Sequence, residues 1–154
     1  MGLRIGALAV RRSIFIQAPP ARVWQEFETA ERIAQWLDRG HRLHAIEPRV
    51  GGRVDMSVEI DGERRHYGGP VLVVEREREM SFEIQWDASW AAAYSRSPAT
   101  YWTLLLTPVY GGTLVELFHH GFERGGPAAA DDLEGYEEGW DVKHLKALRG
   151  IVEK

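Results

Sequence analysis

The chain has 154 residues, no cysteine and a formal net charge of −4, from 19 basic and 23 acidic residues. Without cysteine it forms no disulfide and offers no thiolate for metal binding or catalysis. The basic residues are interspersed with acidic ones and form no stripe, so nucleic acid is not an expected partner. A chain of this length fits one domain with its own core, and its composition suits a cytoplasmic location.

The first twelve residues form an apolar leader that is too short to span a membrane and lacks a signal-peptide cleavage site. We expect this leader, residues 1–12, to be either mobile or an extra strand, and residues 13–154 to form the domain. Gly6 stands where a myristoylation signal requires Ser or Thr. Neither lipid attachment nor a membrane partner is therefore expected.

The domain is predicted to begin with a short strand over residues 13–17. Pro19 and Pro20 end it, because proline cannot donate to a strand ladder but does pre-set the first turn of a helix. Apolar side chains at helical spacing then predict two short helices. The residues that define them are Val23, Trp24 and Phe27 in the first and Ile33, Trp36 and Leu37 in the second.

From about residue 43 to residue 120 the apolar residues alternate with polar ones, which predicts consecutive antiparallel strands. Asp61-Gly62 is a dipeptide that tight hairpin turns prefer, and Gly111-Gly112 marks a second turn. The alternation places Ser81 and Thr103 on the outer face, whereas residues 71–74 are apolar throughout and their orientation stays open. The residues expected to face inward are Val54, Met56, Val58, Ile60, Met80, Phe82, Ile84, Trp86, Trp102, Leu104, Leu106, Val115, Leu117 and His119.

The last twenty-odd residues return to helical spacing, with Asp131 as a candidate N-cap and basic residues toward the other end. The apolar side of this helix is broad, as expected for a helix laid across a sheet. It comprises Leu133, Tyr136, Trp140, Leu145, Leu148, Ile151 and Val152.

Four segments together carry a family resemblance over most of residues 13–152: IQAPPARVW followed by Trp36, GPVLVVEREREMSFEIQW, TLLLTPVYGGTLVELFHHGF and GWDVKHLKAL. In this order and spacing they resemble START-like (SRPBCC) proteins homologous to the activator of heat-shock protein 90 ATPase. The resemblance implies an α+β helix-grip fold, with a curved antiparallel sheet of six or seven strands, two short helices after the first strand and a long C-terminal helix over the sheet. Proteins of this fold include ligand carriers, co-chaperones and aromatase/cyclases.

The inward aromatic residues converge on the space between the sheet and the last helix, where they either line a cavity or fill the core. Residues 87–99 are long for a hairpin loop, and we expect them to form a lid that exposes Trp90 and Tyr94 and offers Arg96 as a polar contact. The residues expected to contact a ligand are Met56, Phe82, Trp86, Trp90, Tyr94, Trp102, Leu104, Leu117, His119, Tyr136 and Trp140.

Few residues suggest catalysis or metal binding. His41 and His44 are three apart and would point to opposite faces of a strand, so no metal site and no cofactor is expected. His119 is either a hydrogen-bonded core histidine or a catalytic candidate. The first hypothesis is therefore a domain that binds a small hydrophobic or aromatic molecule. The alternatives are a co-chaperone-like or other protein-interaction module and a cyclase- or hydrolase-like enzyme using His119; a homodimer through the loop or an edge strand is also compatible with the sequence.

Overall fold

One antiparallel sheet organises the part of the chain that the structure describes. The structure is a computed structural model, and it describes residues 2–37, 41–90, 98–128 and 142–154. Seven strands lie in the order β1-β7-β6-β5-β4-β3-β2, so that the chain meanders from β2 to β7 and β1 pairs with β7. The strands are β1 Ala9–Ile16, β2 His41–Ile46, β3 Arg53–Ile60, β4 Glu63–Glu75, β5 Glu79–Trp86, β6 Thr100–Val109 and β7 Gly112–His120.

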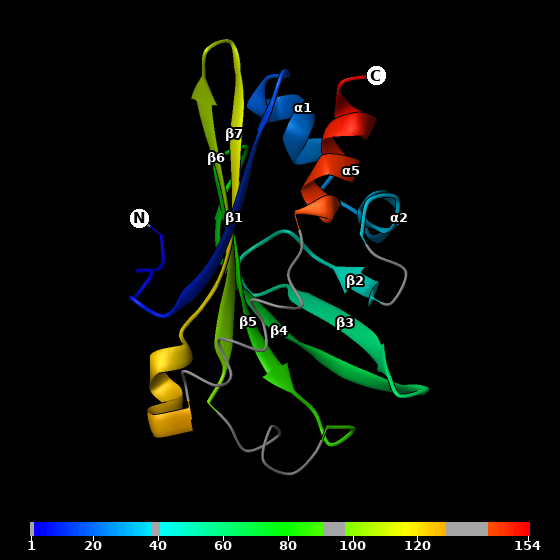
Figure 1. Cartoon of the computed structure of the whole chain (residues 1–154), viewed down its shortest axis with the longest axis vertical. Helices are drawn as coiled ribbons and strands as arrows, with labels where there is room; N and C mark the ends of the chain where they lie inside the picture. Colours follow the sequence, from blue (N-terminus) through cyan, green and yellow to red (C-terminus); the bar gives the residue numbers. More distant parts are fainter. Residues whose placement is uncertain (1, 38–40, 91–97, 129–141) are drawn as a thin grey trace.

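The sheet is bent, and the bend creates a concave face (Figure 1). The pairing register shifts between Leu43 and Ala45 in β2 and between Val71 and Val73 in β4. At Gly68 the backbone has φ 150°, and a Cβ atom there would meet the carbonyl oxygen of Val54. Irregular pairing and a glycine at a close backbone approach are the usual means of curving a sheet.

Two short helices follow β1, as the sequence predicts. They are α1, Pro20–Gln25, and α2, Ala30–Ala34. The hydroxyl of Thr29 accepts a hydrogen bond from the backbone N–H of Arg32 and caps α2. The carboxylate of Glu26, which is 1% exposed, accepts from Arg22 at 2.7 Å and from Arg32 at 2.8 Å. These two ion pairs, both made by Oε1, join the helices and compensate part of the burial of the carboxylate.

The C-terminal helix, α5 (Lys143–Val152), lies on the same side of the sheet as α1 and α2 (Figure 1). It buries His144, Leu145, Leu148 and Val152. The carboxylate of Glu153 accepts a hydrogen bond from the backbone N–H of Gln17 at 2.7 Å, which ties the helix end to the end of β1. The earlier part of the predicted helix, with Asp131, Leu133, Tyr136 and Trp140, lies outside the described residues.

The predicted inward-facing residues form the core on the concave face. The predicted orientation is confirmed for residues that are buried in one hydrophobic core and for His119, which is buried and paired with Trp102 of that core. The core residues are Met80, Phe82, Ile84 and Trp86 of β5, Trp102, Leu104 and Leu106 of β6, and Val115 and Leu117 of β7. In β3, Val54 is buried and Met56 packs against the core, whereas Val58 and Ile60 are only half-buried. Val71, whose orientation was open, is buried opposite Phe82.

The convex face carries a buried polar network. Ser81 donates to or accepts from Thr103 at 2.9 Å, and the hydroxyl of Thr103 lies 2.7 Å from Nε2 of His120. The three residues are 0%, 1% and 1% exposed. Ser81 and Thr103 lie on the outer face, as predicted, and on this face both are buried.

The N-terminal segment, residues 2–8, passes over this face of the sheet. It lies on the side of the sheet opposite to the three helices, in dark blue in Figure 1. A Cβ atom on Gly2 would meet the carboxylate of Glu79, and one on Gly6 would meet that of Glu123, so the segment passes both ends of the network. Its Leu3, Ile5 and Leu8 are half-buried. The strand β1 then begins at Ala9, four residues earlier than the sequence predicts.

Candidate functional site

Four aromatic rings pack against one another in the middle of the concave face. Phe82 and Trp102 have ring centroids 4.9 Å apart and planes inclined by 30°. Phe27, just after α1, lies 6.4 Å from Trp102 and 5.1 Å from Trp36. These separations are those of favourable aromatic pairs in a core. Phe82 and Trp102, both predicted ligand contacts, therefore have other protein rings as neighbours.

A second aromatic group lies at the end of the sheet where β5 stops and β6 starts. Trp90, in the segment after β5, meets Trp86 at 6.4 Å and Tyr67 of β4 at 6.3 Å, both nearly edge-to-face. The indole N–H of Trp90 donates to the carbonyl of His66 at 2.8 Å, and the guanidinium of Arg65 lies 5.9 Å from the indole. Trp90 is half-buried, so the expectation of an exposed side chain is wrong for this residue.

His119 lies on the concave face at the same end of the sheet. It is 3% exposed, its Nε2 lies 2.7 Å from the hydroxyl of Thr100, and its ring is 4.7 Å from that of Phe122. Burial, with a smaller contribution from the charge of His120, lowers the pKa of His119 to about 3. The imidazole is therefore neutral at physiological pH and acts as a hydrogen-bonding group.

A further polar group joins three elements across the concave face. The phenol oxygen of Tyr67 lies 3.4 Å from Nδ1 of His41 in β2. The ring of His41 meets that of His144 in α5 edge-on, with centroids 6.3 Å apart. Burial raises the pKa of Tyr67 well above its usual value, so the phenol keeps its proton. Tyr67 and His144 are candidate site residues that the sequence did not single out, and His41 was considered there only as a metal ligand.

The remaining predicted ligand contacts fall into two sets. Leu104 and Leu117 are paired across β6 and β7 and are buried, and Met56 is paired with Tyr67 across β3 and β4. Leu104 and Leu117 belong to the hydrophobic core, and Met56 packs against it. Tyr94, Arg96, Tyr136 and Trp140 lie outside the described residues.

The histidines of β2 face opposite sides of the sheet, as their spacing predicts. His41 faces Tyr67, whereas Nε2 of His44 lies 2.7 Å from the hydroxyl of Ser57 and its ring lies 5.6 Å from that of His66. Over the described residues, no group of three or more His, Cys, Asp or Glu side chains is placed to hold a metal ion. No helix in this part of the chain is long and apolar enough to cross a membrane.

Comparison with known proteins identifies the family. The model of a family described as Activator of Hsp90 ATPase homolog 1-like protein matches residues 17–153. The chain belongs to this family. The match includes both aromatic groups and His119, and it confirms the resemblance found in the four sequence segments. No curated protein matches the chain.

Solved structures of similar proteins have the same fold as this chain. A protein from Chromobacterium violaceum is 23% identical with a TM-score of 0.71, over 97% of this chain and 99% of that one. A protein from Arthrobacter aurescens is 17% identical with a TM-score of 0.74, over 99% and 90%. DynU16, described as a putative protein in the dynemicin biosynthetic locus, is 21% identical with a TM-score of 0.65, over 97% of this chain and 48% of that one. The helix-grip fold predicted from the sequence is therefore confirmed.

Proposed function

We propose that the concave face binds a neutral hydrophobic or aromatic small molecule at the end formed by Tyr67, Trp86 and Trp90. The position of Trp90 carries this proposal. Its indole comes from a segment outside the sheet, yet a hydrogen bond to the His66 carbonyl holds it beside two aromatic residues of the sheet. Edge-to-face rings from two segments form a wall on which a flat apolar molecule can stack.

Two polar groups of the concave face, Tyr67 and His119, favour a ligand without charge. The phenol of Tyr67 keeps its proton and the imidazole of His119 stays neutral, because burial disfavours the charged state of each group. Tyr67 with His41, and His119 with Thr100, can exchange hydrogen bonds with a carbonyl or hydroxyl group. A buried ion would find no opposite charge in either pair and would lose its hydration.

The same observation favours binding over acid–base catalysis by His119. A general acid or base works best when its pKa is near the pH at which it operates. A pKa of about 3 leaves His119 without a proton to give at neutral pH and makes it a weak base. Its hydrogen bond to Thr100 fits a residue that orients a bound molecule.

The neutral fluorescent probe N-phenyl-1-naphthylamine tests the site directly. We expect Trp90→Ala to weaken probe binding about tenfold, since an aromatic contact contributes up to roughly 1.5 kcal/mol beyond its buried area. Tyr110→Asn, which changes an exposed aromatic residue at the other end of the sheet, is the matched control and should bind as the original chain does. Equal affinity in all three chains, with circular dichroism unchanged, would refute the proposal.

A natural ligand can be sought in the same preparation. Freshly purified protein is denatured and its small-molecule extract is analysed by mass spectrometry beside an extract of Trp90→Ala. We expect an apolar, uncharged species that is enriched in the original chain. A species that bears a phosphate or carboxylate and is equally abundant in both would contradict the proposed ligand class.

The description of the family names an alternative, activation of the Hsp90 ATPase. The observation that favours it is the match over residues 17–153. Steady-state ATP hydrolysis by Hsp90 with and without the purified protein tests this activity, and Trp90→Ala separates it from ligand binding. Stimulation that survives Trp90→Ala would place the activity on another surface.

A further inference from the structure

Tyr67 takes part in both the aromatic and the polar contacts at the Trp90 end of the sheet. Its ring lies 6.3 Å from the indole of Trp90, so it belongs to the aromatic wall. Its phenol oxygen lies 3.4 Å from Nδ1 of His41, whose ring meets that of His144 at 6.3 Å. A molecule that stacks on the wall therefore lies beside a pair of hydrogen-bonding groups.

The residues at this end are covered to different degrees. Tyr67, His41 and Trp90 are half-buried, whereas their neighbours Trp86 and His144 are buried. A half-buried side chain keeps a surface that a small molecule can reach, and its contacts with buried neighbours fix its orientation before a ligand arrives. Groups held in this way bind a ligand with a smaller loss of conformational entropy.

The Tyr67–His41 pair suits a ligand group that both donates and accepts a hydrogen bond. Burial raises the pKa of Tyr67, so its phenol keeps its proton and can donate. A ring nitrogen of a neutral imidazole either donates or accepts, depending on the tautomer. The separation of 3.4 Å is beyond the usual length of a hydrogen bond between such groups, so the bond within the pair is weak.

A hydroxyl group on the ligand would strengthen this arrangement. It can accept from one member of the pair and donate to the other, because a hydroxyl has both a proton and lone pairs. A carbonyl or an ether oxygen only accepts, and a methyl group does neither. The hydroxyl is therefore the group that both members of the pair recognise.

A charged group, the guanidinium of Arg65, also lies beside the wall, 5.9 Å from the indole of Trp90. It donates to the carbonyl of Ser89 at 2.8 Å and pairs with the carboxylate of Glu63 at 3.5 Å. An anionic ligand would have to compete with these two partners and would lose its own hydration. The contacts of Arg65 therefore favour an uncharged ligand over a carboxylate.

We propose that the ligand is a neutral phenol, an aromatic molecule with a hydroxyl group on its ring, and that this hydroxyl binds to Tyr67 and His41 while the ring stacks on Trp90. This proposal rests on the proposed function and adds the chemical class of the ligand and the two residues that select it. Tyr67 makes two separable contributions, because phenylalanine in its place keeps the aromatic contact and removes the hydrogen bond.

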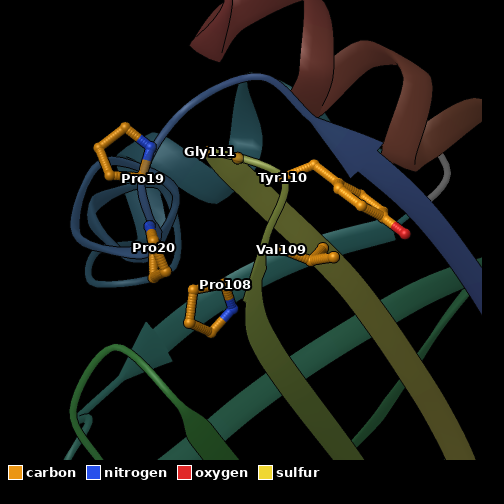
Figure 2. Close-up of a pocket in the computed structure, with 7 residues that line it drawn as sticks. Pro19, Pro20, Pro108, Val109, Tyr110 and Gly111 are labelled. Carbon is orange, nitrogen blue, oxygen red and sulfur yellow. The ribbon is translucent and has the colours of Figure 1, made fainter.

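An apolar pocket at the other end of the sheet offers no such selection. It has a volume of about 360 Å³ and is bounded by Pro19 and Pro20 and by residues 108–112 of the β6–β7 hairpin. Among these lining residues only Tyr110 has a side-chain hydroxyl, and Figure 2 shows its ring pointing away from the prolines. The length of β6 separates this pocket from the Trp90 end by about 30 Å. Binding at the two places can therefore be told apart.

Three naphthalenes of similar size test the ligand class by displacement of N-phenyl-1-naphthylamine. 2-Naphthol donates and accepts hydrogen bonds, 2-methoxynaphthalene only accepts them, and 2-methylnaphthalene does neither. We expect 2-naphthol to bind to the original chain about tenfold more tightly than 2-methylnaphthalene, with 2-methoxynaphthalene between them, which is the upper end of what one net hydrogen bond contributes.

The outcomes separate this proposal from the proposed function. Equal affinities of the three naphthalenes would overturn the preference for a hydroxyl and leave the proposed function in place. If neither the probe nor any naphthalene binds, as judged also by direct quenching of tryptophan fluorescence, both are refuted. Tighter binding of the 2-naphthoate anion than of 2-naphthol would overturn the uncharged class and make Arg65 the partner of the ligand.

Tyr67→Phe tests which residues select the hydroxyl. We expect this variant to bind 2-naphthol about tenfold more weakly and to bind 2-methylnaphthalene and the probe as before, because the ring stays. A variant that had lost its fold would instead lose all three ligands alike. His41→Phe should reduce the preference to about threefold, since one of the two partners remains.

Two other tyrosines supply matched controls for the loss of a phenol hydroxyl. Tyr101→Phe removes one from the convex face and Tyr110→Phe removes one beside the second pocket, and both variants should keep the full preference for 2-naphthol. A preference that persists in Tyr67→Phe, or one that is lost in Tyr110→Phe, would overturn the assignment of the hydroxyl to Tyr67 and His41.

Discussion

His119 and His120 are neighbours in β7 that face opposite sides of the same sheet, and each places Nε2 2.7 Å from a threonine hydroxyl of β6. His119 meets Thr100 on the concave face, and His120 meets Thr103 on the convex face. Both are buried, and burial lowers the pKa of both; at His120 the nearby charge of Glu123 acts in the opposite direction. At this position the sheet therefore excludes water from both faces, by different means.

The two faces differ in what covers them. The concave face is covered by aromatic residues and three helices that belong to the family's fold, whereas the N-terminal segment passes over the convex face. An aromatic core depends on shape, and a buried polar network depends on every hydrogen bond being made. Substitutions on the two faces should therefore fail in different ways.

Truncation of adjacent β6 residues should show the largest difference between the faces. Trp102 is buried between Phe27 and Phe82 on the concave face, and Trp102→Ala should cost about 3–5 kcal/mol in the free energy of unfolding. Tyr101 is half-buried on the convex face, 2.6 Å from Arg124 through its hydroxyl, and Tyr101→Ala should cost about half as much. Urea denaturation measures both. Equal losses would mean that the convex face is packed as tightly as the concave one.

Acid should destabilise the protein by protonating the two buried histidines of β7. Protonation of His119, on the concave face, should cost more than protonation of His120. Because folding lowers the pKa of His119 from about 6.5 to about 3, the unfolded chain binds more protons between these values. The contribution of His119 to the free energy of unfolding should be fully present above pH 6.5. Below that pH it should fall by about 1.4 kcal/mol per pH unit, which is a loss of about 2 kcal/mol at pH 5.

Glutamine substitutions assign this pH dependence to one face or the other. His119→Gln keeps a hydrogen-bonding side chain without a titrating group, so it should flatten the profile between pH 6.5 and 5. His120→Gln should flatten it less, because the charge of Glu123 opposes the lowering of the His120 pKa. Guanidinium titrations at several pH values measure the slopes. An unchanged slope in His119→Gln would show that this residue is not the source.

Local rules in the sequence predicted much of the sheet and of its inner face. The Asp61-Gly62 turn and the alternation in β5 and β6 are determined within a few residues, and the burial of Phe82, Trp86 and Trp102 followed from them. The alternation states on which side of the sheet a residue lies. It does not state whether another segment covers that side, which is why the burial of Ser81 and Thr103 was missed.

Contacts between distant segments account for the other differences at the candidate site. Tyr67, His41 and His144 come from β4, β2 and α5, and no local pattern relates these positions. Trp90 is fixed by a bond to a backbone carbonyl 24 residues earlier, which carries no side-chain signal. The histidine spacing in β2 could have indicated that His41 faces inward, but its partner required the register of β3 and β4.

Single hydrogen bonds lie under the N-terminal segment, and the loss of one of them in Ser81→Ala should have the smallest effect. Thr103→Val leaves Nε2 of the buried His120 without its partner and should cost about 1–3 kcal/mol, whereas Ser81→Ala leaves the Thr103–His120 bond in place and should cost about 0.5–1.5 kcal/mol. Deleting residues 2–8 should reduce the cost of Thr103→Val, because water could then reach the imidazole and replace the lost partner. The four chains, with and without the deletion and the substitution, form a thermodynamic cycle measured by urea denaturation. If Thr103→Val costs the same in both backgrounds, the N-terminal segment does not keep the convex face dry, and the burial of His120 must come from Tyr101 and its neighbours alone.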